Sequence, residues 1–211
     1  TLDGTLFPYT TLFRSAEDLR RHLRLLTGQP PFDRNAAGGG TVYLNDWDAA
    51  AAAGIRPDRL GLAGDAFHLQ THGGDLHLLA ASDRGILYAV SDVLRRLGVR
   101  WYTPTVSRLP RLREAVLPAL AETVRPAFEY RDMIALDCAD PVFLMRLRVN
   151  GHFSRIPGYL GGHQAYGMHV HTYYRLVPPQ KHFAAHPEYY SLVAGKRREA
   201  GAQLCLTHPD V

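Results

Sequence analysis

The stretch from Ser82 to Pro104 constrains the fold of this chain more than any other part of the sequence. Asp83 stands in the first turn of a predicted helix, where the helix dipole favours a carboxylate. Gly98 follows the last apolar position, where a left-handed cap is expected. Residues 99–102 then predict a short strand that ends before Pro104. Between Asp83 and Gly98, apolar residues recur at the spacing of one helix face: Ile86, Leu87, Val90, Val93, Leu94 and Leu97. A helix that leads directly into a strand must lie against a sheet.

The segments before this helix predict the strands of that sheet. Residues 41–44 form a short apolar run, and an alanine-rich helix or turn follows over 48–54. Residues 66–71 and 76–80 alternate in polarity on either side of Gly73-Gly74, which predicts a hairpin. Strands that alternate with helices predict a small, two-layer α/β domain.

The first fifteen residues are predicted to be foreign to this domain. Residues 5–15 look like the translation of a common sequencing adapter, so we expect 1–15 to be a cloning or assembly scar. The alternative is a natural apolar strand, against which Phe7-Pro8 argues. Residues 16–27 then predict an amphipathic helix, and the α/β domain is expected over 16–104.

Composition excludes several classes of function. The formal net charge is only +4, and no basic run is interleaved with aromatic residues, so nucleic acid is not an expected partner. No segment is apolar enough to span a membrane. Cys138 and Cys205 are far apart and favour two separate thiols over a zinc site or a disulfide. No cofactor is predicted, and the oligomeric state stays open. The missing initiator Met and the stop at Val211 indicate an internal fragment.

The second half predicts the beginning of a different domain. Residues 105–124 are rich in proline and arginine and are predicted to be a connector. A strand over 128–133, a helix over 140–148 and a second strand over 168–173 follow. Strand, helix and strand with polar side chains at the strand ends are typical of a (β/α)8 barrel. We therefore expect residues 125–211 to be the first strands and helices of a truncated barrel.

Two sets of motifs carry a resemblance to known families, which covers nearly everything from Ala16 to Val211. The run from Asp83-Arg84-Gly85 to Leu97-Gly98-Val99-Arg100-Trp101-Tyr102-Thr103-Pro104 resembles the end of the small domain before the barrel in alpha-glucuronidases and beta-N-acetylhexosaminidases. Later motifs resemble a bacterial family of uncharacterised glycosidase-like proteins with that architecture: Phe128-Glu129-Tyr130-Arg131-Asp132, Arg148-Val149-Asn150-Gly151, His186-Pro187-Glu188-Tyr189-Tyr190, Gly195-Lys196-Arg197 and Gln203-Leu204-Cys205-Leu206-Thr207.

The resemblance implies a function for the longer protein. It implies an O-glycosyl hydrolase that acts on polysaccharide-derived sugars, either uronic acids or N-acetylated sugars, and it favours a secreted or periplasmic location. The fragment by itself is expected to be inactive. The alternative is a non-catalytic carbohydrate-binding or surface protein that keeps the glycosidase-like fold.

Arg131 and Asp132 are the first candidate sugar-binding residues. They stand where the first barrel strand should end, at the mouth of the barrel. The resemblance implies that Arg131 grips sugar hydroxyls, and an arginine beside a carboxylate suits paired contacts with vicinal hydroxyls. The alternative is a salt bridge at the rim. Asn150 is assigned to the same site.

His169, His171 and Tyr173 are the second group of candidates. Alternate residues of a strand share a face, so the two imidazoles could contact sugar, bind a metal or simply pack. No third ligand is assigned, so no metal site is predicted. Tyr173 belongs to a tyrosine-rich loop whose rings could stack on sugar.

The catalytic residues of a glycosidase are a pair of carboxylates, about 5–10 Å apart. No pair in this sequence qualifies: Asp137 and Asp140 are predicted to be loop and N-cap carboxylates. The resemblance places the acids on later strands, beyond Val211.

Four residues of the small domain carry packing predictions. A side chain larger than Gly85 should clash with the neighbouring strand, and Trp101 should be among the most buried residues. His68 and His77 are expected to be ordinary polar-face residues of their strands.

Overall fold

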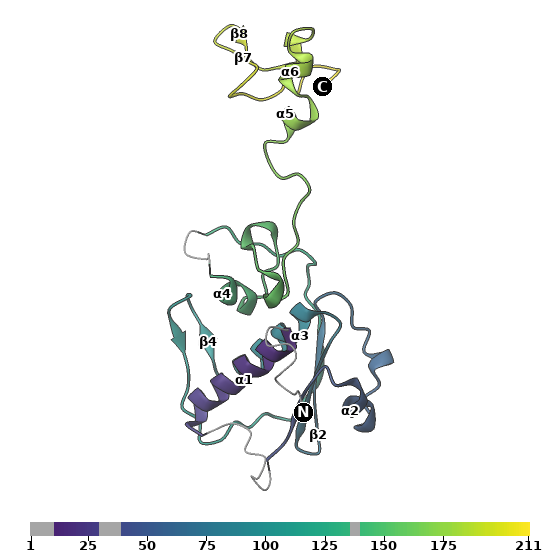
Figure 1. Cartoon of the computed structure of the whole chain (residues 1–211), viewed down its shortest axis with the longest axis vertical. Coiled ribbons are helices and arrows are strands. Elements are labelled where there is room, and N and C mark those ends of the chain that lie inside the picture. Colours follow the sequence, from purple (N-terminus) through teal and green to yellow (C-terminus); the bar gives the residue numbers. More distant parts are fainter. Residues whose placement is uncertain (1–10, 30–38, 136–139) are drawn as a thin grey trace. The chain divides into compact units, whose positions relative to one another are not determined.

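The computed structural model describes residues 11–29, 39–135 and 140–211, which form two compact units (Figure 1). The first unit ends at Ala165 and contains α1 (Thr11–Thr27), β1 (Val42–Leu44), α2 (Trp47–Ala52), the 3-10 helix η1 (Pro57–Arg59), β2 (Phe67–His72), β3 (Asp75–Ala80), α3 (Asp83–Arg96), β4 (Arg100–Trp101), β5 (Ser107–Arg108), β6 (Ala121–Val124), α4 (Pro141–Arg146), η2 (His152–Ser154) and η3 (Gly158–Leu160). The second unit, Tyr166–Val211, contains α5 (Tyr173–Leu176), α6 (Pro179–His182), η4 (Pro187–Tyr189), β7 (Leu192–Val193) and β8 (Lys196–Arg197).

A small mixed sheet of order β1-β3-β2-β6 forms the centre of the first unit. β1 runs parallel to β3, and β3 and β2 form the predicted hairpin. β6 pairs antiparallel with β2, with Val124 opposite Phe67. The segment that we predicted as a connector, 105–124, therefore supplies a strand of the sheet. The fold is of the mixed α/β kind.

Helices cover both faces of this sheet (Figure 1). On one face, α1 and α3 pack on a continuous apolar cluster that includes Phe67, Leu69, Leu78, Ile86 and Leu94, all of them fully buried. On the other face, α2 contributes Ala50 to a smaller cluster around Leu79. The prediction of two layers is thus too simple, because α2 and η1 add a partial third layer.

His68 and His77 lie on this second face of the sheet. His77 pairs with Tyr43 and Gln70 in register, on the same face as Leu79, and its ring stacks on Tyr43 at 4.8 Å. His68 contacts the Thr123 hydroxyl through Nδ1 at 2.8 Å. Both histidines are buried, at 4% and 2% exposed.

The ends of α3 follow the sequence rules. The Ser82 hydroxyl accepts a hydrogen bond from the Gly85 N–H at 3.1 Å, and Asp83 lies in the first turn. Gly98 follows the helix with φ of 93°, as predicted for a left-handed cap. A Cβ at Gly85 would lie 2.8 Å from the Cβ of Ala80, so the predicted close approach to the neighbouring strand is confirmed.

Trp101 is less buried than we predicted. β4 pairs only with β5, in a ribbon outside the main sheet, so the indole is only half-buried. One face of the indole packs under the Arg146 guanidinium at 4.8 Å, and the indole forms a T-shaped pair with His22, with 5.8 Å between the ring centres. The prediction that Trp101 is among the most buried residues is therefore wrong.

Both predicted barrel strands are also wrong. Residues 128–133 pair with no strand in the described part of the chain. Side chains satisfy several of their backbone groups instead: Asn150 accepts from the Arg131 N–H and donates to the Glu129 carbonyl. In the segment 168–173, Val170 and His171 have φ of 33° and 52°, which a strand cannot contain. The helix predicted over 140–148 is present as the shorter α4, and Asp140 caps it as predicted. Asp137 and Cys138 lie outside the described residues.

We retain the proposal that residues 1–15 are foreign and expect their deletion to lower the Tm by less than about 4 °C. Residues 1–10 lie outside the described part, and Thr11–Ser15 form the beginning of α1. The Thr11 hydroxyl donates a hydrogen bond to Asp83 at 3.0 Å, which contributes about 1 kcal/mol. Leu12 also packs on the edge of the apolar cluster, and the Arg14 guanidinium lies 4.3 Å from the centre of the Tyr159 ring. Thermal unfolding of the shortened chain checks this. A larger loss would show that Ser15, which is fully buried, belongs to the native fold.

Candidate functional site

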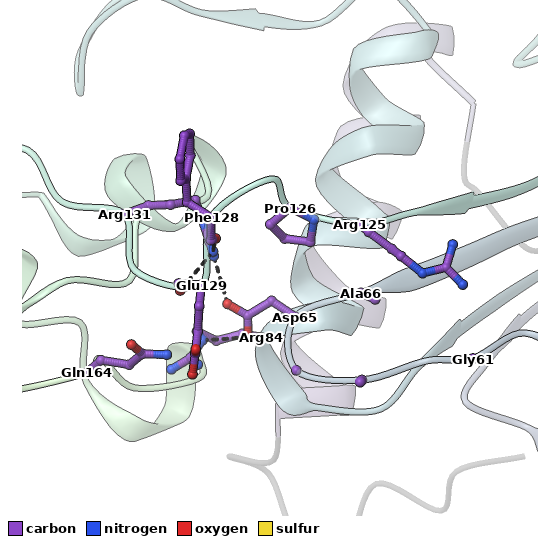
Figure 2. A pocket seen from close by; sticks show the side chains of 12 residues that line it. Gly61, Asp65, Ala66, Arg84, Arg125, Pro126, Phe128, Glu129, Arg131 and Gln164 are labelled. Carbon is purple, nitrogen blue, oxygen red and sulfur yellow. Dashed lines mark hydrogen bonds and ion pairs between the residues drawn. The ribbon is translucent and has the colours of Figure 1, made fainter.

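Asp65 is the centre of the candidate site. It lies just before β2, and its side chain is only 5% exposed. Oδ1 accepts a hydrogen bond from Nε of Arg84 at 3.0 Å, and Oδ2 accepts one from Nη2 of Arg131 at 2.7 Å (Figure 2). Arg84 comes from the first turn of α3, and Arg131 comes from the irregular segment after β6. One carboxylate therefore joins two arginines from distant parts of the first unit.

Arg131 uses its whole guanidinium group inside the chain. Nε donates to the carbonyl of Arg148 at 2.6 Å. Nη1 donates to the carbonyls of Phe128 and Glu129 at 2.6 and 3.1 Å. Nη2 donates to Asp65 at 2.7 Å and to the Tyr88 hydroxyl at 3.4 Å, so all five N–H donors have an acceptor. The donors that we expected to grip sugar are thus engaged by protein groups. The sugar-binding role of Arg131 stays a prediction.

Asn150 completes this network. It is fully buried, and its Nδ2 donates to Asp65 at 3.0 Å and to the carbonyl of Glu129 at 2.8 Å. Its Oδ1 accepts a hydrogen bond from the backbone N–H of Arg131 at 2.9 Å. The Asn150 amide therefore satisfies backbone groups of residues 129–131, as a neighbouring strand would in a sheet.

Asp132 organises the loop that follows α4. It accepts four hydrogen bonds, from the Tyr130 hydroxyl, the Ser154 hydroxyl and the backbone N–H groups of Met133 and Phe153, at 2.7–2.9 Å. A Cβ at Gly151 would lie 2.3 Å from the Cγ of Asp132, so only glycine fits there. Asp132 thus holds η2 in place.

Both carboxyl groups are held in the ionised form. Burial alone would raise the pKa of Asp65, but the hydrogen bond from Arg131 and the charge of Arg84 outweigh burial and lower the pKa. Burial acts in the same way on Asp132, where the hydrogen bonds from Phe153 and Tyr130 lower the pKa. A glycosidase acid needs a raised pKa, so neither group suits that role.

A cavity of about 400 Å³ opens beside Asp65. Arg84, Glu129 and Gln164 line it, and the exposed ring of Phe128 stands at its edge. Arg125 also lines it, but its guanidinium donates to the carbonyl of Leu60 and points away from Asp65 in Figure 2. A cavity with several polar groups and one aromatic ring can hold a small polar molecule.

Comparison with known proteins identifies the family. Residues 101–211, more than half of the chain, match a family described as "Domain of unknown function (DUF4838)". The chain belongs to the DUF4838 family. None of the curated proteins matches it. The match covers Arg131, Asp132 and Asn150, whereas Asp65 and Arg84 precede it.

One solved structure shares the fold of this DUF4838 chain. It is described as a novel family GH115 4-O-methyl-alpha-glucuronidase, BtGH115A, with specificity for decorated arabinogalactans. The two are 18% identical with a TM-score of 0.52, over 74% of this chain and 27% of the glucuronidase chain. The described part of the DUF4838 chain holds no helix that is both long and apolar enough to cross a membrane.

The other predicted site residues lie in the second compact unit of the DUF4838 chain. The His169 ring stacks on Tyr166 at 5.2 Å, His171 is exposed, and Tyr173 begins α5. The structure thus brings together Arg131, Asp132 and Asn150. The other three candidates, His169, His171 and Tyr173, do not lie at the end of a strand. Among the described residues, no cluster of three His, Cys, Asp or Glu side chains could hold a metal ion.

Sequence reasoning missed Asp65 and the role of Arg84. Asp65 is a charged residue directly before the apolar run of β2, and this position is a weak signal for a buried carboxylate. Arg84 was noticed only as part of the motif at the start of α3. Their pairing with Arg131 has no local signature in the sequence.

Acid should weaken this network. Because the folded-state pKa of Asp65 lies below its usual value of 3.8, its contribution is complete above about pH 4 and is lost as the pH falls through the lower, folded-state value. We expect the Asp65→Asn variant to be less stable than wild type at pH 7 and the difference to shrink towards pH 3. Urea unfolding midpoints between pH 3 and 7 check this, and a difference that is independent of pH would contradict it.

Proposed function

We propose that this DUF4838 chain is part of a carbohydrate-active protein with a glycoside-hydrolase-like role. The observation that carries the proposal is the fold shared with the family GH115 alpha-glucuronidase. Because the chain spans only 27% of that chain's length, the activity is assigned to the longer protein. Its substrates would be polysaccharide-derived sugars that carry a uronic acid.

Within this proposal, the chain supplies scaffold and part of a sugar site. The sheet of the α/β domain predicted over 16–104 extends into the predicted connector 105–124 through β6. That residues from 125 onward begin a barrel in the longer protein belongs to the proposal. So does sugar contact by His169, His171 and Tyr173. The four carboxyl groups of the described residues with displaced pKa values, Asp18, Asp65, Asp132 and Glu188, are all displaced downward, so the general acid is expected elsewhere in the longer protein.

The test is an assay of the complete protein. The complete reading frame is expressed, and the protein is incubated with polysaccharides decorated with glucuronic or 4-O-methylglucuronic acid, and in parallel with N-acetylhexosaminides. We expect release of the free uronic acid, and loss of release when a paired Asp or Glu of the later region is changed to its amide.

Two results would count against the proposal in different ways. Binding of these polysaccharides without release of sugar would favour the alternative, a non-catalytic carbohydrate-binding protein. Neither binding nor release from uronic-acid or N-acetylated substrates would overturn the proposed role.

A further inference from the structure

The match to DUF4838 begins at Trp101, but the first compact unit continues to Ala165 without a break at that point. β6 lies inside the matched region and pairs with β2, which precedes it. We call the part of the first unit before Trp101 the α/β layer. We infer that the matched region carries a docking surface for this layer, and that three aspartate–arginine pairs determine how the two parts dock. The two parts then form one folding unit. This inference does not depend on the proposed sugar chemistry.

The apolar side of this surface comes from α4 and the loops after it. Leu144, Met145, Ile156 and Leu160 are at most 5% exposed and belong to the same cluster as α3. The Ser91 hydroxyl contacts Sδ of Met145 at 3.8 Å. Without the layer, residues 101–165 of the matched region would leave these side chains in water, so this part has no separate core.

The charged side of the surface is complementary in sign. Each of three arginines of the matched region pairs with an aspartate of the layer: Arg131 with Asp65 at 2.7 Å, Arg146 with Asp18 at 3.0 Å, and Arg148 with Asp92. All six side chains are less than a quarter exposed. Charges paired in this way fix register and orientation, because any other docking leaves a buried charge unpaired.

The backbone also fits closely at one point. The Arg84 guanidinium donates to the carbonyl of Gly161 at 3.1 Å. A Cβ at Gly161, which has φ of 87°, would lie 2.1 Å from the Cγ of Arg84. The loop after η3 therefore approaches α3 as closely as only a glycine permits.

Hydrogen exchange of the full chain, read by mass spectrometry, tests the inference. Leu78→Ala opens a cavity in the layer, far along the sequence from the matched region. We expect peptides from β2–β3 and from residues 140–164 to lose protection together, by the same factor and at least about tenfold. Asp65→Asn should also accelerate exchange in both sets. If Leu78→Ala fails to fold, the milder Ile86→Val, at another fully buried position, replaces it.

Leu204→Ala is the matched control, since Leu204 is also buried, at 4% exposed, but belongs to the second unit. It should leave both peptide sets unchanged. Unchanged protection of residues 140–164 in Leu78→Ala would overturn the inference, because the matched region would then hold its structure without the layer. Faster exchange confined to residues 128–164 in Asp65→Asn would also overturn it.

Discussion

Replacing Asp65 with alanine is expected to lower the free energy of unfolding of the first unit by about 3–5 kcal/mol. The change leaves the largely covered side chains of Arg84 and Arg131, 17% and 19% exposed, without their shared counter-charge, and it removes an acceptor of the Asn150 amide. For a chain of this size the loss corresponds to a fall in Tm of about 10 °C. Urea unfolding at pH 7, followed by circular dichroism, measures it.

Asp58→Ala is the control for this prediction. Asp58 also pairs with an arginine, Arg56, but both side chains are more than 60% exposed, so we expect a change within about 0.5 kcal/mol. Arg131→Ala should be destabilising as well, and Arg131→Lys should restore little, because one ammonium group cannot serve five acceptors in a plane. If Asp65→Ala proves as mild as Asp58→Ala, the network does not stabilise the fold, and a ligand-binding role for Arg131 gains weight.

Tyr88→Ala is the second change with a large expected effect, about 3–5 kcal/mol. The ring is fully buried on α3 between the sheet and the matched region, and its removal leaves a cavity at their junction. The hydroxyl donates to the carbonyl of Val149 at 3.3 Å and accepts a hydrogen bond from Arg131 at 3.4 Å. Tyr88→Phe removes only these hydrogen bonds and should cost about 1 kcal/mol.

Chemical denaturation of the two variants separates the contribution of the ring to the free energy of unfolding from that of the hydroxyl. Tyr102→Ala serves as the control, because Tyr102 is 59% exposed and should tolerate the change within about 0.5 kcal/mol. Equal losses for Tyr88→Phe and Tyr88→Ala would contradict the expected division, since the hydroxyl would then carry the whole effect.

Much of the small domain could be predicted from the sequence because it depends on neighbours a few residues apart. The cap of α3 joins Ser82 to Gly85, and the hairpin turns at Gly73-Gly74 between two alternating runs. Helix periodicity, caps and tight turns are decided within one or two turns of chain. The sequence therefore predicted α3, its two ends and the β2–β3 hairpin.

Only the tertiary structure decided the role of the charged residues. The segment 128–133 was predicted to be a strand, but the side chains of Arg131 and Asn150 bond several of its backbone groups and no ladder forms there. Arg131 finds its carboxylate 66 positions earlier, in Asp65. An arginine at a barrel mouth and an arginine in a buried ion pair look the same in sequence. What separates them is which distant acceptors the fold brings within hydrogen-bonding distance of the guanidinium, because five unpaired donors cannot be buried.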